Sequence, residues 1–323
     1  MNETNLKKAT IPTRRAFSER MVEYAHVNTD FAVMEADIGG STYTNLFGRA
    51  HPERYFNMGI AEGNMVSAAS GMAADGRPVV VSSYGVFLTM RAVESVRTFI
   101  CYPNLNVKFL SSHGGLTAAI DGVTHQATED IAFMTTLPNM KVLVPADTAA
   151  ARQALDLALE TPGPVFVRLM RDPLFDIYDA STQFHVGGSH QLREGRDITI
   201  VSYGDIVFQA LQAAEVLAAE GIGAEVIDMY SVKPFDAARL TASLAKTGAL
   251  LVAENHQARN GLGYELAAWC LKNNPVPFAN LGLDDTFAES GDYQKLLGKY
   301  GFSADWIVRA AKEIIGRKEG RAC

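Results

Sequence analysis

Strand, helix and strand patterns follow one another in Lys141-Val-Leu-Val-Pro-Ala-Asp147-Thr-Ala-Ala-Ala-Arg-Gln-Ala-Leu-Asp-Leu-Ala-Leu-Glu160-Thr-Pro-Gly-Pro164-Val-Phe-Val-Arg168. Both ends of this stretch are short apolar runs bounded by turn residues, as expected of buried strands. Between them, from Thr148 to Glu160, apolar residues recur at helical spacing, and Asp147 is placed to cap the first turn. This order is typical of a parallel sheet with a crossover helix.

The same alternation extends in both directions along the chain. Apolar runs predict further strands at 31–34, 78–82 and 106–110, and helical spacing predicts helices at 15–27, 61–74 and 91–100. Later in the chain, strands are predicted at 197–203, 224–229 and 249–253, and helices at 205–220, 262–271 and 303–315. We therefore expect an α/β protein with two doubly wound, mainly parallel sheets.

The chain of 323 residues has about twice the length of a typical domain. Between residues 172 and 197 the strand and helix patterns fade into polar and glycine-rich sequence that includes Gly187-Gly188-Ser189. We expect a first domain at 12–178, a linker at 179–196 and a second domain at 197–318.

Charge and composition exclude several classes of function. The 29 lysines and arginines are outnumbered by 36 aspartates and glutamates, which gives a net charge of −7 and argues against a surface for nucleic acid or anionic membranes. A hydrophobic content of 48% and a charged content of 20% are those of a globular protein. Small molecules or proteins are the expected partners.

Cysteine usage and the N-terminus predict where the protein resides. Cys101, Cys270 and Cys323 are widely separated and odd in number, so no disulfide framework is expected. The first fifteen residues are polar and contain no apolar targeting segment, and no apolar run is long enough to span a bilayer. We expect a cytoplasmic protein.

Phosphate-binding motifs of the P-loop and dinucleotide types do not occur after a predicted strand. Gly261-Leu-Gly263 opens a predicted helix, and we interpret it as a tight connection rather than an anion site.

Chemistry-bearing residues instead follow the predicted strands, where open α/β sheets place their ligand crevices. Glu62 begins a helix of small apolar residues, and Tyr84 and Phe87 follow the strand at 78–82 with a spacing of three. Taken alone, Glu62 would stabilise the helix dipole by about 0.3–1 kcal/mol, and the two aromatic residues would belong to the core.

Two later segments are harder to explain as packing. The loop after the strand at 106–110 holds His113, Asp121 and His125 among glycines, which suits proton transfer and hydroxyl recognition. The strand at 164–168 is followed by a second arginine, so that Arg168 and Arg171 are expected to include one that reaches the crevice or forms a salt bridge.

These segments together resemble the pyrimidine-binding half of a transketolase, a thiamine-diphosphate enzyme. The motifs are Gly-Ile-Ala-Glu62, the Tyr84/Phe87 pair, and His113 with Asp121-Gly-Val-Thr-His125-Gln. Thr13-Arg14-Arg-Ala-Phe-Ser-Glu19 and Ala36-Asp37-Ile-Gly-Gly-Ser41 are similar to transketolase segments in matching order. The second domain resembles the transketolase C-terminal domain.

The resemblance also implies a partner. In this family an N-terminal domain binds the diphosphate through Mg²⁺ with a Gly-Asp-Gly motif, and no such motif occurs here. The chain thus resembles the C-terminal subunit of a split transketolase. We expect the Mg²⁺ ligands to lie on an N-terminal subunit, and an α2β2 assembly that includes self-association of this chain.

The family's residue roles carry over by position. Glu62 would bond the aminopyrimidine of the cofactor, with Tyr84 and Phe87 flanking that ring and Asp37 near the cofactor at the subunit interface. His113, Asp121 and His125 would contact the donor sugar, with His113 and His125 counted as catalytic beside Glu62. Arg14, Ser41 and Arg171 would contact its phosphate. Tyr84 stands where many relatives have phenylalanine, and Met90 stands where some have an aromatic residue.

The implied reaction is transfer of a two-carbon glycolaldehyde unit from a ketose phosphate to an aldose. The sugar could be a pentose phosphate or a branched one such as apulose 4-phosphate. Two alternatives remain open at this point. The chain could belong to a related thiamine enzyme, such as 1-deoxyxylulose-5-phosphate synthase or the β subunit of a 2-oxo acid dehydrogenase, or it could be a non-catalytic interaction subunit.

Overall fold

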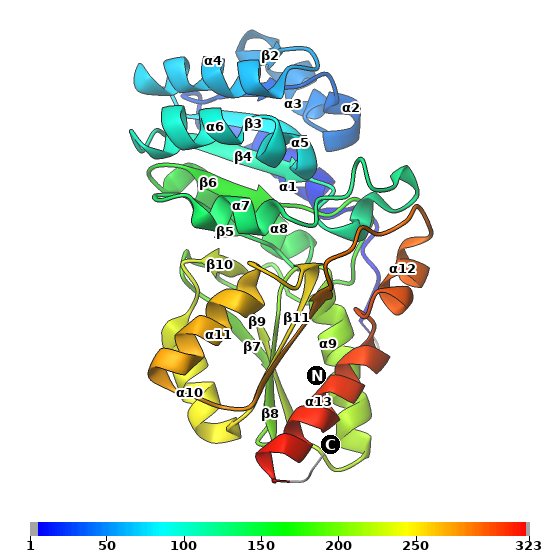
Figure 1. Ribbon diagram of the computed structural model, residues 1–323. Coiled ribbons are helices and arrows are strands. Elements are labelled where there is room, and N and C mark those ends of the chain that lie inside the picture. The colour runs from blue at the N-terminus through cyan, green and yellow to red at the C-terminus, as the bar shows by residue number, and fades with distance from the viewer. Residues whose placement is uncertain (1–5, 321–323) are drawn as a thin grey trace.

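Two α/β units, each built on a mainly parallel sheet, lie one above the other in the computed structural model, which describes residues 6–320 (Figure 1). The first sheet has the strand order β10-β5-β6-β4-β3-β1-β2. Its strands are β1 (Ala32–Glu35), β2 (Tyr55–Asn57), β3 (Val79–Tyr84), β4 (Val107–Ser112), β5 (Lys141–Leu143), β6 (Val165–Arg168) and β10 (Ser231–Lys233). All pair in parallel except β10, which is antiparallel to β5.

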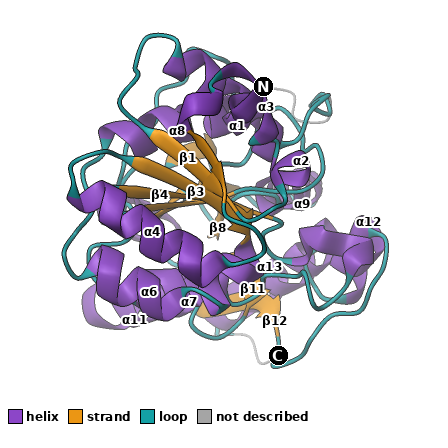
Figure 2. Ribbon diagram, turned by 90° about the horizontal axis from the view of Figure 1, so that it is seen from above, coloured by secondary structure: helices purple, strands orange, loops and turns teal. Residues whose placement is uncertain are grey.

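Helices cover both faces of this sheet, and Figure 2 shows them on either side of the strands. They are α1 (Thr13–Ala25), α2 (Gly39–Thr42), α3 (Asn45–Ala50), α4 (Glu62–Ala74), α5 (Gly85–Met90), α6 (Val93–Ser95), α7 (Asp130–Thr136) and α8 (Thr148–Glu160), with shorter turns at η2 (Pro52–Arg54), η3 (Val96–Cys101) and η4 (Leu116–Asp121). Successive β3 residues alternate between the two cores, since Val80 packs with α1 and α8 whereas Val79 and Val81 pack with α4.

The fold-deciding stretch forms β5, α8 and β6 as predicted. The Asp147 carboxylate accepts a hydrogen bond from the Ala150 amide and so caps α8. Ala151 and Leu155 lie on the buried face of this helix. The outward-facing Asp156 pairs with Arg20 of α1, which fastens the two helices together.

The second unit contains a sheet of order β12-β11-β8-β9-β7. Its strands are β7 (His190–Arg193), β8 (Ile198–Ser202), β9 (Ala224–Asp228), β11 (Leu250–Gln257) and β12 (Phe278–Leu283), and its helices are α9 (Ile206–Ala219), α10 (Ala237–Thr247), α11 (Leu262–Asn273), α12 (Tyr293–Lys299) and α13 (Ala304–Lys318). The prediction of two mainly parallel α/β sheets is confirmed.

The stretch expected as a linker contains a strand of the second sheet. β7 pairs antiparallel with β9, and Gln191 lies opposite Ile227. The His190 ring packs among the aromatic rings of Tyr178, Phe184 and Tyr230, which explains why this polar segment is ordered against the sheet.

The two units also share structure across the expected boundary. Strand β10 follows β9 of the second unit but pairs with β5 of the first sheet, Ser231 opposite Leu143. Lys233 then donates hydrogen bonds to the carbonyls of Thr135 and Leu137, at the C-terminal end of α7. One hydrophobic core contains Phe109 of the first sheet and Val252 of the second.

One predicted helix is interrupted. The helix expected at 91–100 is divided into α6 and the π-helical turn η3, and it begins only at Val93 because Ala92 has a φ of −112°, outside the helical region. Over residues 6–320, no helix has the length and apolar character needed to cross a membrane.

Candidate active site

The predicted site residues follow neighbouring parallel strands of the first sheet. Asp37 comes after β1, Tyr84 ends β3, His113 comes after β4 and Arg171 comes after β6. These strands are adjacent in the order β6-β4-β3-β1, so their carboxyl ends meet at one edge of the sheet. Parallel pairing is therefore what gathers residues that lie far apart in sequence.

Glu62 is buried at the start of α4, with 3% of its surface exposed. Its carboxylate accepts a hydrogen bond from the Ser83 hydroxyl, at 3.2 Å, and is paired with Arg91, whose Nη1 lies 3.2 and 3.3 Å from the two oxygens. A carboxylate that only stabilised a helix start would not need this burial, since that effect operates at the surface.

Arg91 joins Glu62 to the aromatic pair. Its guanidinium lies 3.9 Å from the centre of the Phe87 ring, and about half of its side chain is exposed. No role for Arg91 was predicted from the sequence. A planar cation with N–H donors thus lies on the Phe87 ring and against the Glu62 carboxylate.

The Phe87 ring, on which Arg91 lies, belongs to a single cluster of four rings. The Tyr84 ring centre lies 5.6 Å from that of Phe87 and 4.1 Å from that of His113. The His125 ring lies 5.6 Å from Tyr84 and 5.5 Å from Phe87. The two predicted aromatic residues and the two predicted histidines are therefore neighbours in space.

His113 is a neutral imidazole. It is almost fully buried, and burial together with the positive charges of Arg14 and Arg171 lowers its pKa to about 2. Its Nδ1 lies 2.8 Å from the Ser112 hydroxyl, and that hydrogen bond fixes the orientation of the ring. A neutral histidine can donate or accept one hydrogen bond toward a substrate hydroxyl without carrying charge.

Two arginines lie at the far end of the cluster. Arg14 donates to the Ser41 hydroxyl at 3.0 Å and to the carbonyl oxygens of Ser41 and Arg171. The Tyr84 hydroxyl also donates to the Ser41 hydroxyl oxygen, at 2.9 Å. Burial, and then the positive charge of Arg171, lower the pKa of Arg14. Two neighbouring cations favour an anion at this end.

Asp121 and Arg171 form a partly exposed ion pair in this region. The Arg171 Nε lies 3.7 Å from a carboxylate oxygen of Asp121, and each side chain remains partly exposed. Arg168 instead pairs with Asp130. The expectation that one of the two arginines reaches a salt bridge is thus met by both.

Asp37 lies apart from the cluster. Its carboxylate accepts a hydrogen bond from Asn57 at the end of β2, and its backbone has a φ of +60°. The remaining predicted residues are linked by direct contacts that run from Glu62 through Arg91, Phe87, Tyr84 and Ser41 to Arg14 and Arg171. Ser83 and Arg91 are the two neighbours of Glu62 that sequence reasoning missed.

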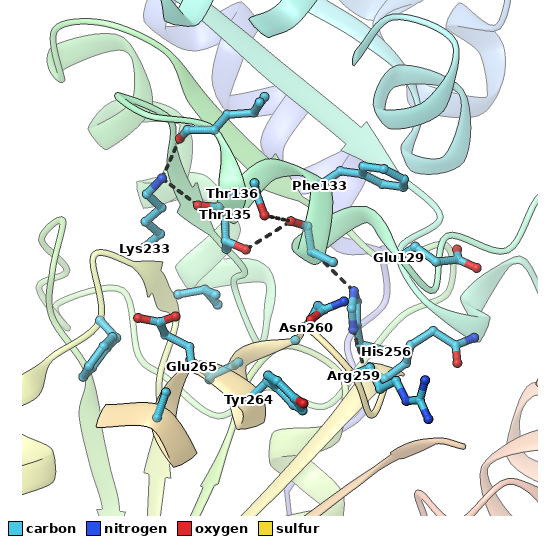
Figure 3. Close-up of a pocket in the computed structure, with 18 of the residues that line it drawn as sticks. Glu129, Phe133, Thr135, Thr136, Lys233, His256, Arg259, Asn260, Tyr264 and Glu265 are labelled. Carbon is cyan, nitrogen blue, oxygen red and sulfur yellow. Dashed lines mark hydrogen bonds between the residues drawn. The ribbon is translucent and has the colours of Figure 1, made fainter. Parts of the chain in front are cut away.

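A separate cavity of about 1130 Å³ lies between α7 and the second unit (Figure 3). Figure 3 shows Phe133 of α7 on one side and His256, Tyr264 and Glu265 on the other. The residues that line it include none of the ten predicted site residues. The candidate site is therefore the residue cluster at the sheet edge and not this cavity.

Comparison with known families identifies the fold. The transketolase pyrimidine-binding domain family matches residues 9–175, and the transketolase C-terminal domain family matches residues 187–307. The chain belongs to the transketolase family.

Two relatives are similar over nearly their whole length. The chain is 39% identical over 309 residues to the 6-deoxy-6-sulfo-D-fructose transketolase subunit SqwH of Clostridium sp. (strain MSTE9), a match that covers 95% of this chain and 96% of that protein. It is 31% identical to an apulose-4-phosphate transketolase subunit of Phocaeicola vulgatus, over 94% of this chain and 98% of that protein.

A solved structure titled as a split gene transketolase, inactive beta4 tetramer, is also similar. The match has a TM-score of 0.88 and 41% sequence identity, and it covers 96% of this chain and 100% of that one. Since these relatives are transketolase subunits, they favour transketolase over the alternative of 1-deoxyxylulose-5-phosphate synthase.

Proposed function

We propose that this chain is the pyrimidine-binding, substrate-recognising subunit of a two-chain transketolase that moves a two-carbon unit from a ketose phosphate to an aldose. The supporting observation is the continuous series of contacts that links the buried Glu62 carboxylate to the Arg14 and Arg171 end of the cluster. Together with the His113 and His125 rings that contact Tyr84, this series provides an acid, an aromatic surface, two histidines and an anion site at one sheet edge.

The Glu62 end fits the aminopyrimidine of thiamine diphosphate. The Arg91 guanidinium, a planar group with N–H donors, already lies on the Phe87 ring and against the Glu62 carboxylate. A planar aminopyrimidine would make the same two kinds of contact, and the half-exposed Arg91 side chain has solvent into which it can move. Glu62, Tyr84 and Phe87 are the residues that would hold this ring.

Glu62 would share a proton with the pyrimidine nitrogen and so raise the basicity of the ring's amino group. Bound thiamine diphosphate supplies a nucleophilic carbon for attack on the ketose carbonyl. Ser83 keeps the Glu62 carboxylate in place through its hydroxyl. Burial excludes water from this contact and strengthens it.

The histidine side of the cluster would bind the donor sugar. Neutral His113 and the Asp121 carboxylate would hydrogen-bond its hydroxyls, and the partly exposed His125 would donate to the oxygen on which charge develops. Arg14, Ser41 and Arg171 would bind the terminal phosphate through charge-assisted hydrogen bonds. The names of both full-length relatives describe sugars with a terminal anion, which supports an anionic donor.

Replacing Arg171 with alanine is expected to impair use of phosphorylated donors selectively. A charge-assisted contact contributes roughly 1.5–3 kcal/mol, so kcat/KM should fall about 10- to 100-fold for a ketose phosphate and much less for the free sugar. Steady-state kinetics on both donors in the reconstituted complex measures this ratio.

Arg49→Ala, which removes an exposed arginine of α3 outside the cluster, is the matched control and should change neither donor. Equal losses on phosphorylated and free sugars would mean that Arg171 acts through its contact with Asp121 in shaping the loop, not through the phosphate.

The partner would complete the cofactor site. We propose that an N-terminal transketolase subunit binds the diphosphate and supplies the Mg²⁺ ligands, and that Asp37 faces the cofactor where the subunits meet. Exposure of Asp37 at the sheet edge supports its placement at an interface. We expect an α2β2 assembly in which copies of this chain also contact each other.

The isolated chain is expected to bind Mg²⁺-thiamine diphosphate weakly and to transfer no two-carbon units. The reason is that the diphosphate contacts lie elsewhere and that Arg91 already neutralises the Glu62 carboxylate. Titration calorimetry with the isolated chain, and again with the partner present, measures this difference. Micromolar affinity in the isolated chain would contradict the division of the site between two subunits.

A cytoplasmic location is proposed on the chemistry of the thiols. Cys101 and Cys270 are buried and unpaired, and burial raises the pKa of each to about 11. Unpaired cysteines are typical of reducing compartments. Cys323 lies outside the described residues.

A further inference from the structure

The loop that carries the substrate-side residues has a strained backbone at its start. His113 has a φ of +63°, in the left-handed region that non-glycine residues rarely adopt, and Ala119 has a φ of +52°. Such conformations persist only where the surrounding structure holds them. The loop runs from β4 to α7 and bears His113, Asp121 and His125, so what holds it also sets the geometry of these three side chains.

The second unit supplies hydrogen bonds along the whole loop. The Leu116 amide donates to Asn255 Oδ1 at 2.9 Å, and the Gln257 amide donates to the Thr128 carbonyl at 2.8 Å. Gln126 donates to the carbonyl of Glu289, which precedes α12. Figure 1 shows α12 beside the loop that follows β4.

Asn255 is itself fixed from within the second unit. It is fully buried, and its Nδ2 donates to Asp205 at 2.7 Å, while the Tyr293 hydroxyl donates to the same carboxylate. Burial raises the pKa of Asp205. A buried network in which each amide atom has a partner holds the Asn255 side chain in one orientation.

Arg168 connects the same asparagine to the end of the loop. Its Nη2 donates to the Asn255 carbonyl at 2.9 Å and to the Ala127 carbonyl at 3.0 Å. Its Nε is paired with the buried Asp130 at the start of α7. The two ends of the histidine loop are therefore fastened to one position of β11.

The loop backbone also packs directly on these side chains. A Cβ atom at Gly114 would lie 2.6 Å from Arg168 Nε, and one at Gly115 would lie 2.4 Å from Asn255 Cγ. Only glycine can approach this closely, and Gly115 has a φ of +58°. His113 immediately precedes this pair, so a shift of Asn255 would be transmitted to it over a very short distance.

We propose that Asn255 is a positioning residue: from the second domain it holds the backbone of the histidine loop, and so orients His113 and its neighbours toward the donor sugar. The inference rests on the proposed function, because it assumes that this loop binds substrate. The second domain would thus take part in donor recognition indirectly, by holding the loop, without any of its residues contacting the sugar.

The first test is amide hydrogen exchange on the isolated full-length chain. Asn255→Ala removes the acceptor of the Leu116 amide, and peptides covering residues 113–128 should exchange about tenfold faster, as expected for loss of one buried hydrogen bond. Tyr203→Phe is the matched control, since it removes a buried hydroxyl that donates to the adjacent Glu254 and leaves the Leu116 bond in place. Unchanged exchange, or equal acceleration in both variants, would overturn the proposal.

A charge-neutral swap tests the same contact by rescue. Asn255→Asp combined with Asp205→Asn keeps an acceptor for Leu116 and a hydrogen bond between positions 255 and 205, so loop exchange should return toward the wild-type rate. If the alanine variant does not fold, Asn255→Ser gives the same comparison. If the loop amides exchange as fast in the double swap as in Asn255→Ala, the proposal is also contradicted.

The second test separates donor binding from cofactor activation in the reconstituted complex. Asn255→Ala should raise the donor KM or lower kcat by about tenfold while the rate of proton exchange at the cofactor C2 stays at the wild-type value. Equal loss of both would indicate a general structural defect and overturn the proposal. If the Asn255→Ala variant exchanges its loop amides faster but transfers two-carbon units at the wild-type rate, Asn255 does not position the donor site, and the proposed function still stands. If the wild-type complex itself transfers no two-carbon units, the proposed function is wrong. The amide-exchange test still decides in that case whether Asn255 holds the loop.

Discussion

Replacing Glu62 with glutamine is expected to abolish most turnover while the fold remains intact. An amide keeps the shape of the side chain but cannot share a proton with the pyrimidine nitrogen, and general acid–base contributions of about 10²–10⁴-fold set the size of the loss. The substitution also removes one charge of the pair with the half-exposed Arg91, so the change in stability should be at most about 1 kcal/mol.

The matched control is Asp305→Asn, the same change of carboxylate to amide in the first turn of α13. Melting temperature and C2 proton exchange are measured on one preparation of each reconstituted variant. The Asp305 variant should exchange at the wild-type rate. Normal exchange in the Glu62 variant would sink its assignment as the activating acid and leave only a helix-end effect.

Replacing Arg168 with alanine is expected to destabilise the fold more than any of the other substitutions. Arg168 and Asp130 are both completely buried, and their charged groups lie 2.8 Å apart. Burial alone would lower the pKa of Arg168, but the Asp130 carboxylate reverses this and holds it above its ordinary value. Removing one partner leaves an uncompensated buried charge, which costs about 3–5 kcal/mol.

Urea unfolding of the isolated chain measures this loss. Arg15→Ala, which breaks the exposed pair with Glu19, is the control and should change the free energy of unfolding by less than about 1 kcal/mol. The double variant Arg168→Ala with Asp130→Ala should recover part of the lost stability because no lone charge remains. A loss below about 1 kcal/mol in the single variant would show that water or a neighbour replaces the arginine.

Sequence reasoning located the candidate site because the strands that carry it are short and apolar. Tyr84, His113 and Arg171 each follow such a strand, and parallel pairing brings the carboxyl ends of β3, β4 and β6 to one edge. The rule that predicts the crevice is therefore geometric. It needs only the order of elements along the chain.

The partners of these residues could not be predicted in the same way. Arg91 is 29 residues from Glu62, and their pairing depends on how α5 lies against α4. Strand β10 is only three residues long and pairs outside its own unit. Neither contact leaves a periodic pattern in the sequence.

The end of β11 shows why buried polar residues mislead. The predicted strand stopped at Ala253 because Glu254, Asn255 and His256 end the apolar run, yet all three are completely buried within the strand. Each is satisfied by a partner from another element, so burial carries no penalty that hydropathy could reveal.

At Gly261 and Gly263, by contrast, the interpretation from the sequence agrees with the structure. Glu254 accepts hydrogen bonds from the Leu262 and Gly263 amides, so the first turn of α11 is already capped by a carboxylate of this chain. A Cβ at Gly261 would lie 2.4 Å from that carboxylate. The interpretation as a tight connection, and not as a site for an external anion, agrees with this packing.

The central claim is that this chain supplies half of a shared transketolase site. It is tested most directly by titrating the chain into a partner subunit that carries the Gly-Asp-Gly motif and measuring two-carbon transfer from a ketose phosphate. We predict no transfer by either chain alone and activity that rises until the two chains are equimolar. Transfer by the partner alone at the full rate, or no transfer at any ratio, would contradict the claim.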